Sequence, residues 1–371
     1  MPVNSPARRE ESLINPPSAR IAQLDYARAV AIVLVVVCHC SELASHVAMT
    51  QQTLLTQLMF SVLFPLGRFG VPLFLFLTGA LILGKDFSEA DAVSKFYRRK
   101  LLPLFLTVEV WNCLYWAFAS MRQGAFEPVK LLMYLLFLEQ PPVINIWYMP
   151  MILGMYLALP FVAVVVQKFD IKTLLLPFTI VCICAYLPSR IVILLNWQNF
   201  SGFYINTGFL GGQYGAYIVA GYWLFRREAL RRMPRPVCVV VACAGICLTV
   251  AQQFSQLRAG NNYAVWYTDA ILAIAAVFTF ELILRSRVMR KRVAFVESLS
   301  RLSLGVFFVH IIPIVVLSDK LDFGTGALPY VLTFVLLFAV SLPLSWGITA
   351  AVAKFPRLAR VLFDIRPAAR S

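Results

Sequence analysis

The sequence is poor in charge, and above all in acidic side chains. Only 14% of its 371 residues are charged, and 18 Asp and Glu stand against 33 Lys and Arg; a soluble domain carries about 25%. It holds just three histidines, and its eight cysteines form no CxxC pair and no Cys/His cluster with metal-ligand spacing. These shortages argue against a soluble domain, a metal site and a disulfide scaffold. We therefore expect no metal, and interpret the cysteines as small apolar residues of a membrane interior.

Long apolar runs are what the sequence has in abundance. Apolar residues make up 60% of the chain, and about ten stretches approach or reach the length that crosses a bilayer of ~30 Å. The expected fold is all-α, a polytopic integral membrane protein of about ten transmembrane helices. The expected spans are 26–45, 69–84, 101–119, 147–167, 173–194, 207–225, 236–253, 264–284, 300–318 and 328–350.

Two apolar segments fall between these spans, 51–66 and 128–142. We expect short interfacial or re-entrant helices there, which either line an acceptor groove or simply pack against lipid. The span at 69–84 is short for a membrane, so it is also open to extension back towards Leu54.

Basic residues are distributed unevenly between the two sets of loops. With both termini cytoplasmic, the cytoplasmic segments hold 26 Lys and Arg and the opposite segments about six, Arg68 among them. The positive-inside rule requires such a skew. Topology and contact with anionic lipid therefore account for the net charge of +15, and nucleic acid is not an expected partner. The expected organisation is a flexible cytoplasmic tail at 1–22, one membrane domain at 23–354 and a mobile cytoplasmic tail at 355–371.

The first apolar helix carries the most specific arrangement. The stretch 25–41 reads DYARAVAIVLVVVCHCS and places His39 eleven residues after Arg28. Eleven residues make about three helical turns, so both side chains share one face, about 16 Å apart along the axis. An ionisable group that deep in hydrocarbon is costly and indicates a functional site. A cation at the rim and a base deeper in the membrane suit an acyl-CoA donor, and Asp25 can pair with Arg28.

Other polar groups mark further spans. Arg98, Arg99 and Lys100 stand at the start of the third span, where they can hold phosphates or act as a stop-transfer signal. Glu109 follows in the same span, and His310 lies about half-way along the ninth. Intramembrane ionisable groups favour a functional role, although such a histidine is often a packing residue.

Aromatic and glycine residues have equally open interpretations. Trp147 and Tyr148 begin the fourth span, where they support a site or belong to an interfacial aromatic belt. Glycines at 67, 70 and 79 allow helices to approach closely.

Five blocks in this order resemble the acyltransferase 3 family of bacterial integral-membrane acyltransferases, over nearly the whole chain. Within that family the chain looks most like the branch of the enterobacterial common antigen O-acetyltransferase. Two positions depart from the family pattern: Pro72 stands where many members have an acidic residue, and Pro103 where many have another arginine. The blocks are LDYARAVAIVLVVVCH at 24–39, RFGVPLFLFLTG at 68–79, FYRRKLLP at 96–103, WYMPMILGMYLALP at 147–160 and SLGVFFVH at 303–310.

The resemblance implies acyl transfer in the bacterial inner membrane. Acetyl-CoA, or another acyl-CoA, would be a co-substrate and not a bound cofactor, with its phosphates near Arg28 and the 98–100 triplet. His39 would deprotonate a sugar hydroxyl as general base, or carry the acyl group as a covalent relay. Supporting or acceptor-side candidates are Asp25, Glu109, Trp147, Tyr148 and His310.

The acceptor and the acyl group stay open at this point. A surface glycan, a periplasmic glycan or a lipid-linked sugar are all compatible with the residues, as is succinyl in place of acetyl, and the oligomeric state is undefined. A secondary transporter or flippase is the alternative function, since intramembrane Glu109, Asp269 and His39 are also usual there. We find no inverted repeat in the hydropathy to support it.

The charge distribution predicts which loops face the cytoplasm. In a cysteine-reduced background, cysteines introduced near Gln123, Asn199, Gln256 and Asp322 should react with an impermeant thiol reagent in intact, outer-membrane-permeabilised cells. Cysteines in the 226–235 loop should react only after lysis. Labelling of that loop from outside would overturn the topology, and with it a CoA site beside Arg28.

Overall fold

The computed structural model describes residues 21–48, 53–195, 202, 203, 205, 207, 208, 211–260 and 265–365. Over these ranges the chain is helical and forms no strand, so the all-α prediction is confirmed. The expected tail at 1–22 and residues 366–371 lie almost wholly outside the described residues.

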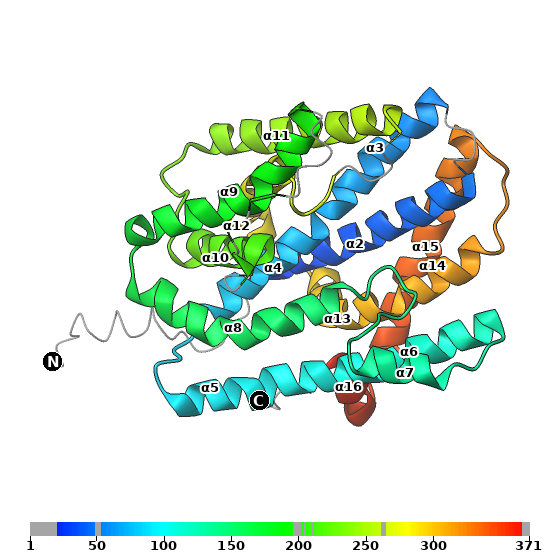
Figure 1. The fold of residues 1–371 in the computed structure, drawn as a ribbon, viewed down its shortest axis with the longest axis horizontal. Coiled ribbons are helices and arrows are strands. Elements are labelled where there is room, and N and C mark those ends of the chain that lie inside the picture. Colours follow the sequence, from blue (N-terminus) through cyan, green and yellow to red (C-terminus); the bar gives the residue numbers. More distant parts are fainter. Residues whose placement is uncertain are drawn as a thin grey trace.

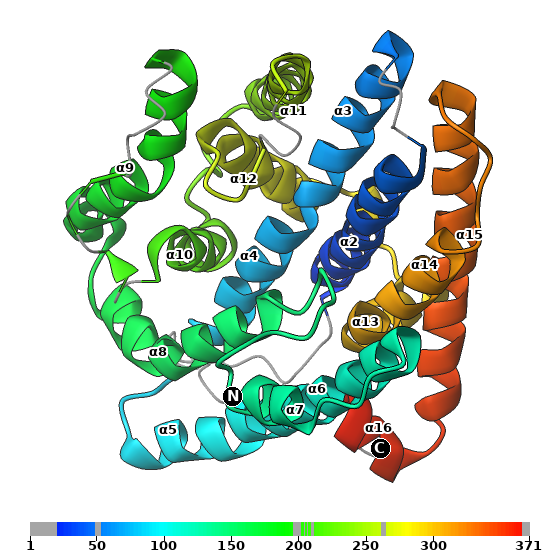
Figure 2. The same cartoon turned by 45° about the vertical axis from the view of Figure 1, so that its right-hand side comes forward.

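One helix, α2 (Ala22–Ala48), lies in the middle of the bundle and packs against α3, α4, α13 and α15 (Figures 1 and 2). The segments α5, α6, α7 and α16 lie together along one edge in both views. After α2 the elements are α3 (Leu54–Arg68), α4 (Gly70–Ile82), α5 (Ala90–Phe96), the π-helical turn η1 (Tyr97–Leu101), α6 (Leu102–Gln123), α7 (Pro128–Leu135), α8 (Tyr148–Lys168), α9 (Ile171–Leu195), α10 (Gly212–Arg226), α11 (Arg235–Arg258), α12 (Ala270–Arg285), the 3₁₀ turn η3 (Val288–Arg290), α13 (Ala294–Val309), α14 (Ile311–Ser318), α15 (Ala327–Val352) and α16 (Pro356–Phe363).

Seven helical segments among the described residues are long and apolar enough to cross a membrane, and eight if α13 and α14 form one bent span. Each expected span coincides with a helix or a pair of helices, but α10 and α12 have only 15 and 16 residues. A straight helix of that length covers about 24 Å, less than the ~30 Å hydrocarbon layer. The polytopic architecture therefore stands, and the number ten stays a prediction.

The second span is longer than the apolar pattern around 69–84 indicates. From Leu54, α3 continues through Phe69 into α4, and Leu54–Ile82 is one candidate span of 29 residues. The extension of this span back towards Leu54 is therefore observed, and the described part of 51–66 belongs to the span and not to a separate interfacial helix. Arg68 is also misplaced by the charge count, because it lies fourteen residues from either end of this span.

Glycine permits two close contacts between helices. A Cβ on Gly67 would lie 2.5 Å from the Cα of Cys38, so the end of α3 touches the α2 backbone beside His39. A Cβ on Gly79 would lie 1.8 Å from the carbonyl oxygen of Ile218, so α4 and α10 are in backbone contact. Small residues at such crossings are the usual basis of tight packing in membranes.

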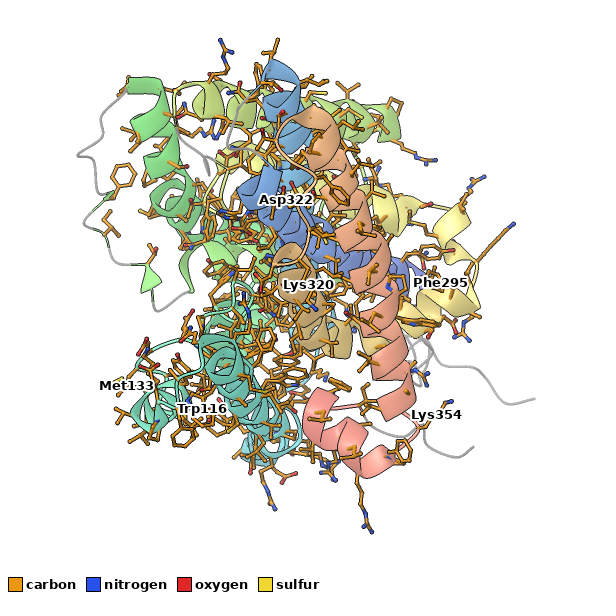
Figure 3. The ribbon with its side chains drawn as sticks, turned by 90° about the vertical axis from the view of Figure 1, so that its right-hand side faces the viewer. Trp116, Met133, Phe295, Lys320, Asp322 and Lys354 are labelled. Carbon is orange, nitrogen blue, oxygen red and sulfur yellow. The ribbon has the colours of Figure 1, made fainter. Side chains whose placement is uncertain are left out.

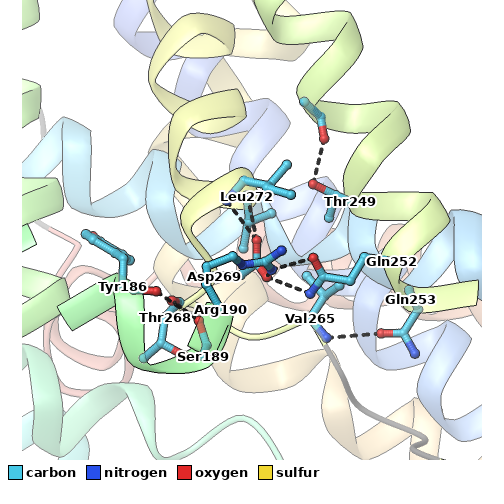
Figure 4. Close-up of polar contacts among 12 residues, drawn as sticks. Tyr186, Ser189, Arg190, Thr249, Gln252, Gln253, Val265, Thr268, Asp269 and Leu272 are labelled. Atoms are coloured by element: carbon cyan, nitrogen blue, oxygen red, sulfur yellow. Dashed lines mark hydrogen bonds and ion pairs between the residues drawn. The ribbon is translucent and has the colours of Figure 1, made fainter. Parts of the chain in front are cut away.

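A buried ion pair holds α9, α11 and α12 together (Figure 4). Asp269 caps α12 by accepting from the backbone N–H groups of Ile271 and Leu272, both at 2.9 Å. Its second oxygen pairs with Arg190 of α9 and accepts from Gln252 of α11 at 2.6 Å. The Asp269 carboxylate is 1% exposed. The two backbone donors, Arg190 and Gln252 together supply the hydrogen bonds and the opposite charge that a buried carboxylate requires. Asp269 therefore has a structural role.

The C-terminal part of the chain is packed where it is described. Figure 3 shows Lys354 next to α16, at the opposite end of α15 from Asp322. The carbonyls of Val361 and Leu362 accept hydrogen bonds from Thr107 and Trp111 at 3.1 and 2.7 Å, and Phe363 is 2% exposed. The expectation of a mobile end is therefore wrong for α16.

We predict that Gly79→Ala disrupts the contact between α4 and α10, because the added methyl group overlaps the Ile218 carbonyl. The loss should be about 1–3 kcal/mol or more, seen as a lower melting temperature and lower yield in detergent. Gly154→Ala in α8 is the matched control, since nothing lies within 4 Å of its Cβ position. Equal stability of the two variants would contradict the assigned contact.

Candidate functional site

Arg28 and His39 both lie on the face of α2 that packs against α13. The hydroxyl of Ser300 donates to Asp25 Oδ1 at 2.6 Å and accepts from Arg28 Nη1 at 3.4 Å. Ten residues later, His310 lies with its ring centroid 5.4 Å from that of His39. The two helices therefore run in the same direction. Ser300 links Arg28 to Asp25, so the expected pairing of the two includes a hydroxyl group that the sequence did not indicate.

The orientation of His39 is set by Glu42, one turn further along α2. Nδ1 of His39 lies 3.4 Å from Glu42 Oε2. An ionised carboxylate only accepts hydrogen bonds, so in the neutral ring Nδ1 carries the proton and Nε2 carries the lone pair. A buried histidine in this tautomer has the base atom that a proton acceptor or a nucleophile needs.

His310 marks a break in its helix. It joins α13 to α14, whose axes differ by 46°. Its Nδ1 lies 3.0 Å from the carbonyl oxygen of Val306, which can only accept, so Nε2 again carries the lone pair. That Nε2 is buried and has no hydrogen-bond partner among the described residues. Two imidazoles with available Nε2 lone pairs thus lie side by side.

The break leaves backbone carbonyls without helical partners, and side chains from outside α13 satisfy them. Tyr115 of α6 donates to the carbonyl of Phe308 at 2.6 Å, and Asn145 donates to that of Phe307 at 3.0 Å. A broken helix inside a membrane is stable only when such groups are paired. The bend at His310 is therefore built into the fold.

A pocket of about 290 Å³ extends from Arg28 towards the two histidines. Lys85 and Lys100 line it together with Arg28, and Tyr148 and Phe307 line it further in. The Phe307 ring lies 5.7 Å from Tyr148 and 6.0 Å from His310, centroid to centroid. Neither histidine lines the pocket itself. Phe307 thus stands between the pocket and the histidine pair.

The polar end of this pocket is rich in cations. Partial burial and the Lys100 ammonium lower the pKa of Lys85 from its ordinary value. Lys100 lies in the π-helical turn η1, a distortion that often accompanies function, and Pro103 occupies the first turn of α6. Three cations and one carboxylate, that of Asp364, line the pocket, and an anionic ligand would reduce the repulsion between the cations. The pocket therefore suits phosphate groups.

The structure separates the basic triplet. Lys100 lines the pocket with Arg28, whereas Arg98 lines a different, largely apolar pocket between α6 and α8. Arg99 is exposed and belongs to neither set of lining residues.

The remaining candidates divide between two places. Tyr148 lines the pocket, while Trp147 packs on Tyr267, with ring centroids 5.2 Å apart. Glu109 is half-buried on α6, outside the pocket, and its Oε1 is buried without a hydrogen-bond partner in the described part of the chain. The structure thus brings Arg28, Lys100, Tyr148, His39 and His310 together and leaves Glu109 apart.

The sequence did not lead us to predict two charged groups of the site, Glu42 and Arg68. Glu42 follows His39 by three residues, a spacing at which helical side chains meet. Arg68 is 3% exposed, and its guanidinium carbon lies 4.2 Å from the ring centroid of Trp266. Treating 54–82 as a single span would have placed Arg68 at its centre and marked it as functional.

Comparison with known proteins gives one finding. A family model described as an acyltransferase domain (Acyl_transf_3) matches residues 21–350. No curated protein and no solved structure matches the chain. Among the residues that the structure describes, no group of three or more His, Cys, Asp or Glu could hold a metal ion.

We predict that Lys100→Gln weakens binding of CoA to the purified protein about tenfold or more, because one charge-assisted phosphate contact is worth roughly 1.5–3 kcal/mol. Arg28→Lys should also weaken it, since the planar fork of donors is lost. Arg98→Gln removes a cation two residues away that lies outside the pocket, and should bind CoA like wild type. Calorimetry measures all three, and a larger effect of Arg98→Gln would place the phosphates elsewhere.

Proposed function

Because the chain belongs to the acyltransferase 3 family, we propose that it moves an acyl group, most simply acetyl, from cytoplasmic acyl-CoA to a hydroxyl group of a surface or periplasmic glycan. The pocket that runs from three cations to Phe307, the neighbour of His310, carries this proposal. Its 290 Å³ volume falls at the lower end of the range for ligand pockets. It combines a cationic end with an aromatic inner end, as a donor with phosphates and a thin acyl-bearing arm requires.

In this arrangement the donor phosphates bind Arg28, Lys85 and Lys100, and the thioester reaches past Phe307. Along α2, Arg28 and His39 are about 16 Å apart, so an extended arm is needed to bridge them. Asp25 and Ser300 hold Arg28 in place through the hydrogen bonds at 2.6 and 3.4 Å. Phe307 and Tyr148 line the inner part of the pocket and exclude water from the thioester of the bound donor.

His39 supplies the chemistry through Nε2 in either of two routes. As a general base, Nε2 takes the proton of the acceptor hydroxyl while the hydroxyl oxygen attacks the thioester carbonyl. The carbon–sulfur bond then breaks, and the CoA thiolate receives the proton from Nε2. As a relay, Nε2 attacks the carbonyl itself and CoA leaves as thiolate. The acceptor oxygen then attacks the acyl-imidazole, the carbon–Nε2 bond breaks, and the hydroxyl proton passes through the freed Nε2 to the thiolate. Glu42 stabilises the positive charge that the ring acquires in both routes. The lone pair of His310 Nε2 is available to hold the acceptor hydroxyl.

The proposed sidedness follows from the charge distribution. With both termini cytoplasmic, the cationic end of the pocket opens to the cytoplasm, where CoA is found. The acceptor then approaches His39 from the opposite face of the inner membrane, and the acyl group crosses the bilayer along the pocket. Parallel packing of α2 and α13 supports this, because both helices begin on the side of Arg28.

We predict that His39→Ala lowers acyl transfer by about 10²–10⁴-fold or more, without loss of expression or membrane insertion. His46→Ala is the matched control, an exposed histidine two turns further along α2, and should keep wild-type activity. The measurements are turnover of labelled acetyl-CoA by purified protein and mass spectrometry of glycans from a deletion strain complemented with each variant.

Activity of His39→Ala within a few-fold of wild type would contradict the assignment of the base. Absence of any acetyl-CoA turnover by the wild-type protein, with an unchanged glycan profile in the deletion strain, would contradict acyl transfer altogether.

A further inference from the structure

Arg68 is a buried cation that contacts no carboxylate in the part of the chain that the structure describes. It lies at the centre of the span Leu54–Ile82 and is 3% exposed. Among the described residues no acidic group lies within 4.0 Å of its guanidinium, and the internal segments outside them contain no Asp or Glu. Glu42 acts on it only through space, since the Glu42 carboxylate faces His39. A guanidinium in a membrane interior is expected to have a counter-ion.

Arg190 is an arginine of the same protein whose charge is compensated by a carboxylate. It is also a mostly buried arginine of a span, and it is paired with Asp269, which is itself capped by backbone and amide donors. Arg68 instead has one hydrogen bond, from Nη1 to the hydroxyl of Tyr267 at 3.1 Å. Its Nε is buried with no hydrogen-bond partner among the described residues, as is the Nε of Arg190, so the two arginines differ in the carboxylate that only Arg190 contacts. The donors of Arg68 are therefore only partly used.

Aromatic rings hold this guanidinium in position. Its carbon lies 4.4 Å from the ring centroid of Phe64, 4.2 Å from that of Trp266 and 5.3 Å from that of Tyr267. Trp147 extends the cluster, with its ring 6.0 Å from that of Trp266. Trp266 is 38% exposed, so the cluster reaches the molecular surface. Flat rings beside an arginine fork are chemistry that suits a sugar bearing an anionic group.

Arg68 lies at the depth of His39 and outside the donor pocket. Gly67 touches the backbone of Cys38, the residue before His39. Arg68 does not line the pocket of Arg28 and Lys100. An anionic group held by Arg68 would therefore place its own sugar beside His39 without competing with CoA.

We propose that Arg68, with the rings of Trp266 and Tyr267, forms the subsite for an anionic group on the acceptor, a carboxylate or a phosphate carried by the sugar. The role of the subsite in acyl transfer rests on the proposed function. Anion binding itself does not, and it can be measured without any acyl donor.

Thermal unfolding of the purified full chain tests the proposal with three sugars at about 10 mM: glucose, glucuronate and glucose 1-phosphate. Binding to the native state raises the melting temperature by mass action. We expect a rise of about 2 °C with glucuronate, with glucose 1-phosphate or with both, and none with glucose. A response to glucuronate alone identifies an acidic sugar, and a response to glucose 1-phosphate alone identifies a phosphate-linked one. Arg68→Gln should lose the rise, with binding weakened at least tenfold by tryptophan fluorescence.

Arg190→Gln is the matched control. We expect the melting temperatures of the two variants to differ from each other in the absence of ligand. Without ligand, Arg190→Gln should melt lower than wild type, because Asp269 loses its cation, and should still respond to the anionic sugar. Arg68→Gln should melt at or above wild type, because the buried cation that it removes has no carboxylate in direct contact among the described residues. Should Arg68→Gln fail to insert, Arg68→Lys takes its place, since it keeps the charge but loses the fork.

Absence of an anion-specific rise in wild type would overturn the subsite, as would an equal rise in the Arg68 variant. A strong loss of stability in Arg68→Gln with the anion response intact would assign Arg68 to packing alone. If acetyl-CoA turnover still depends on His39 in any of these cases, the proposed function stands without the subsite.

Discussion

A charged or titratable side chain inside a membrane needs a partner from the protein, and this constraint organises the structure around α2. Asp25 shares Ser300 with Arg28, Glu42 faces His39, and Asp269 pairs with Arg190. The contacts of Asp25 and Asp269 join helices that are far apart in the sequence, whereas the contact of Glu42 with His39 lies within one turn of α2. Arg68 and Glu109 depart from this pattern, because neither has an oppositely charged group within 4.0 Å among the described residues, and such a departure is where a binding function is expected.

Packing around α2 turns these pairs into one site. The absence of a side chain at Gly67 lets α3 reach the backbone beside His39, which brings Arg68 to the same depth. The bend of 46° at His310 turns α14 away, and Tyr115 and Asn145 satisfy the carbonyls that the bend exposes. The donor pocket and the aromatic cluster of Arg68 are therefore separate places near the histidine pair, as a group transfer between two substrates requires.

Helical periodicity was sufficient to predict the fold class and the shared face of Arg28 and His39, because an eleven-residue spacing has one geometric meaning in a helix. It could not predict tertiary contacts such as those of Ser300, Lys85 and His310, which come from other helices. The triplet at 98–100 looked uniform in the sequence, yet η1 turns Lys100 into the pocket and Arg98 out of it. Arg68 was counted with the loops because the expected span began at residue 69, whereas α3 continues into α4 and places Arg68 inside the span Leu54–Ile82.

The central claim is that one pocket leads a CoA donor from the side of Arg28 to the histidine pair. An electron cryo-microscopy structure of the protein with a non-hydrolysable thioether analogue of acetyl-CoA tests this most directly. The account predicts the nucleotide phosphates against Arg28, Lys85 and Lys100, the acyl group beside His39 Nε2, and Phe307 displaced from its present position. Phosphates bound at Arg68, or an acyl group remote from both histidines, would contradict it.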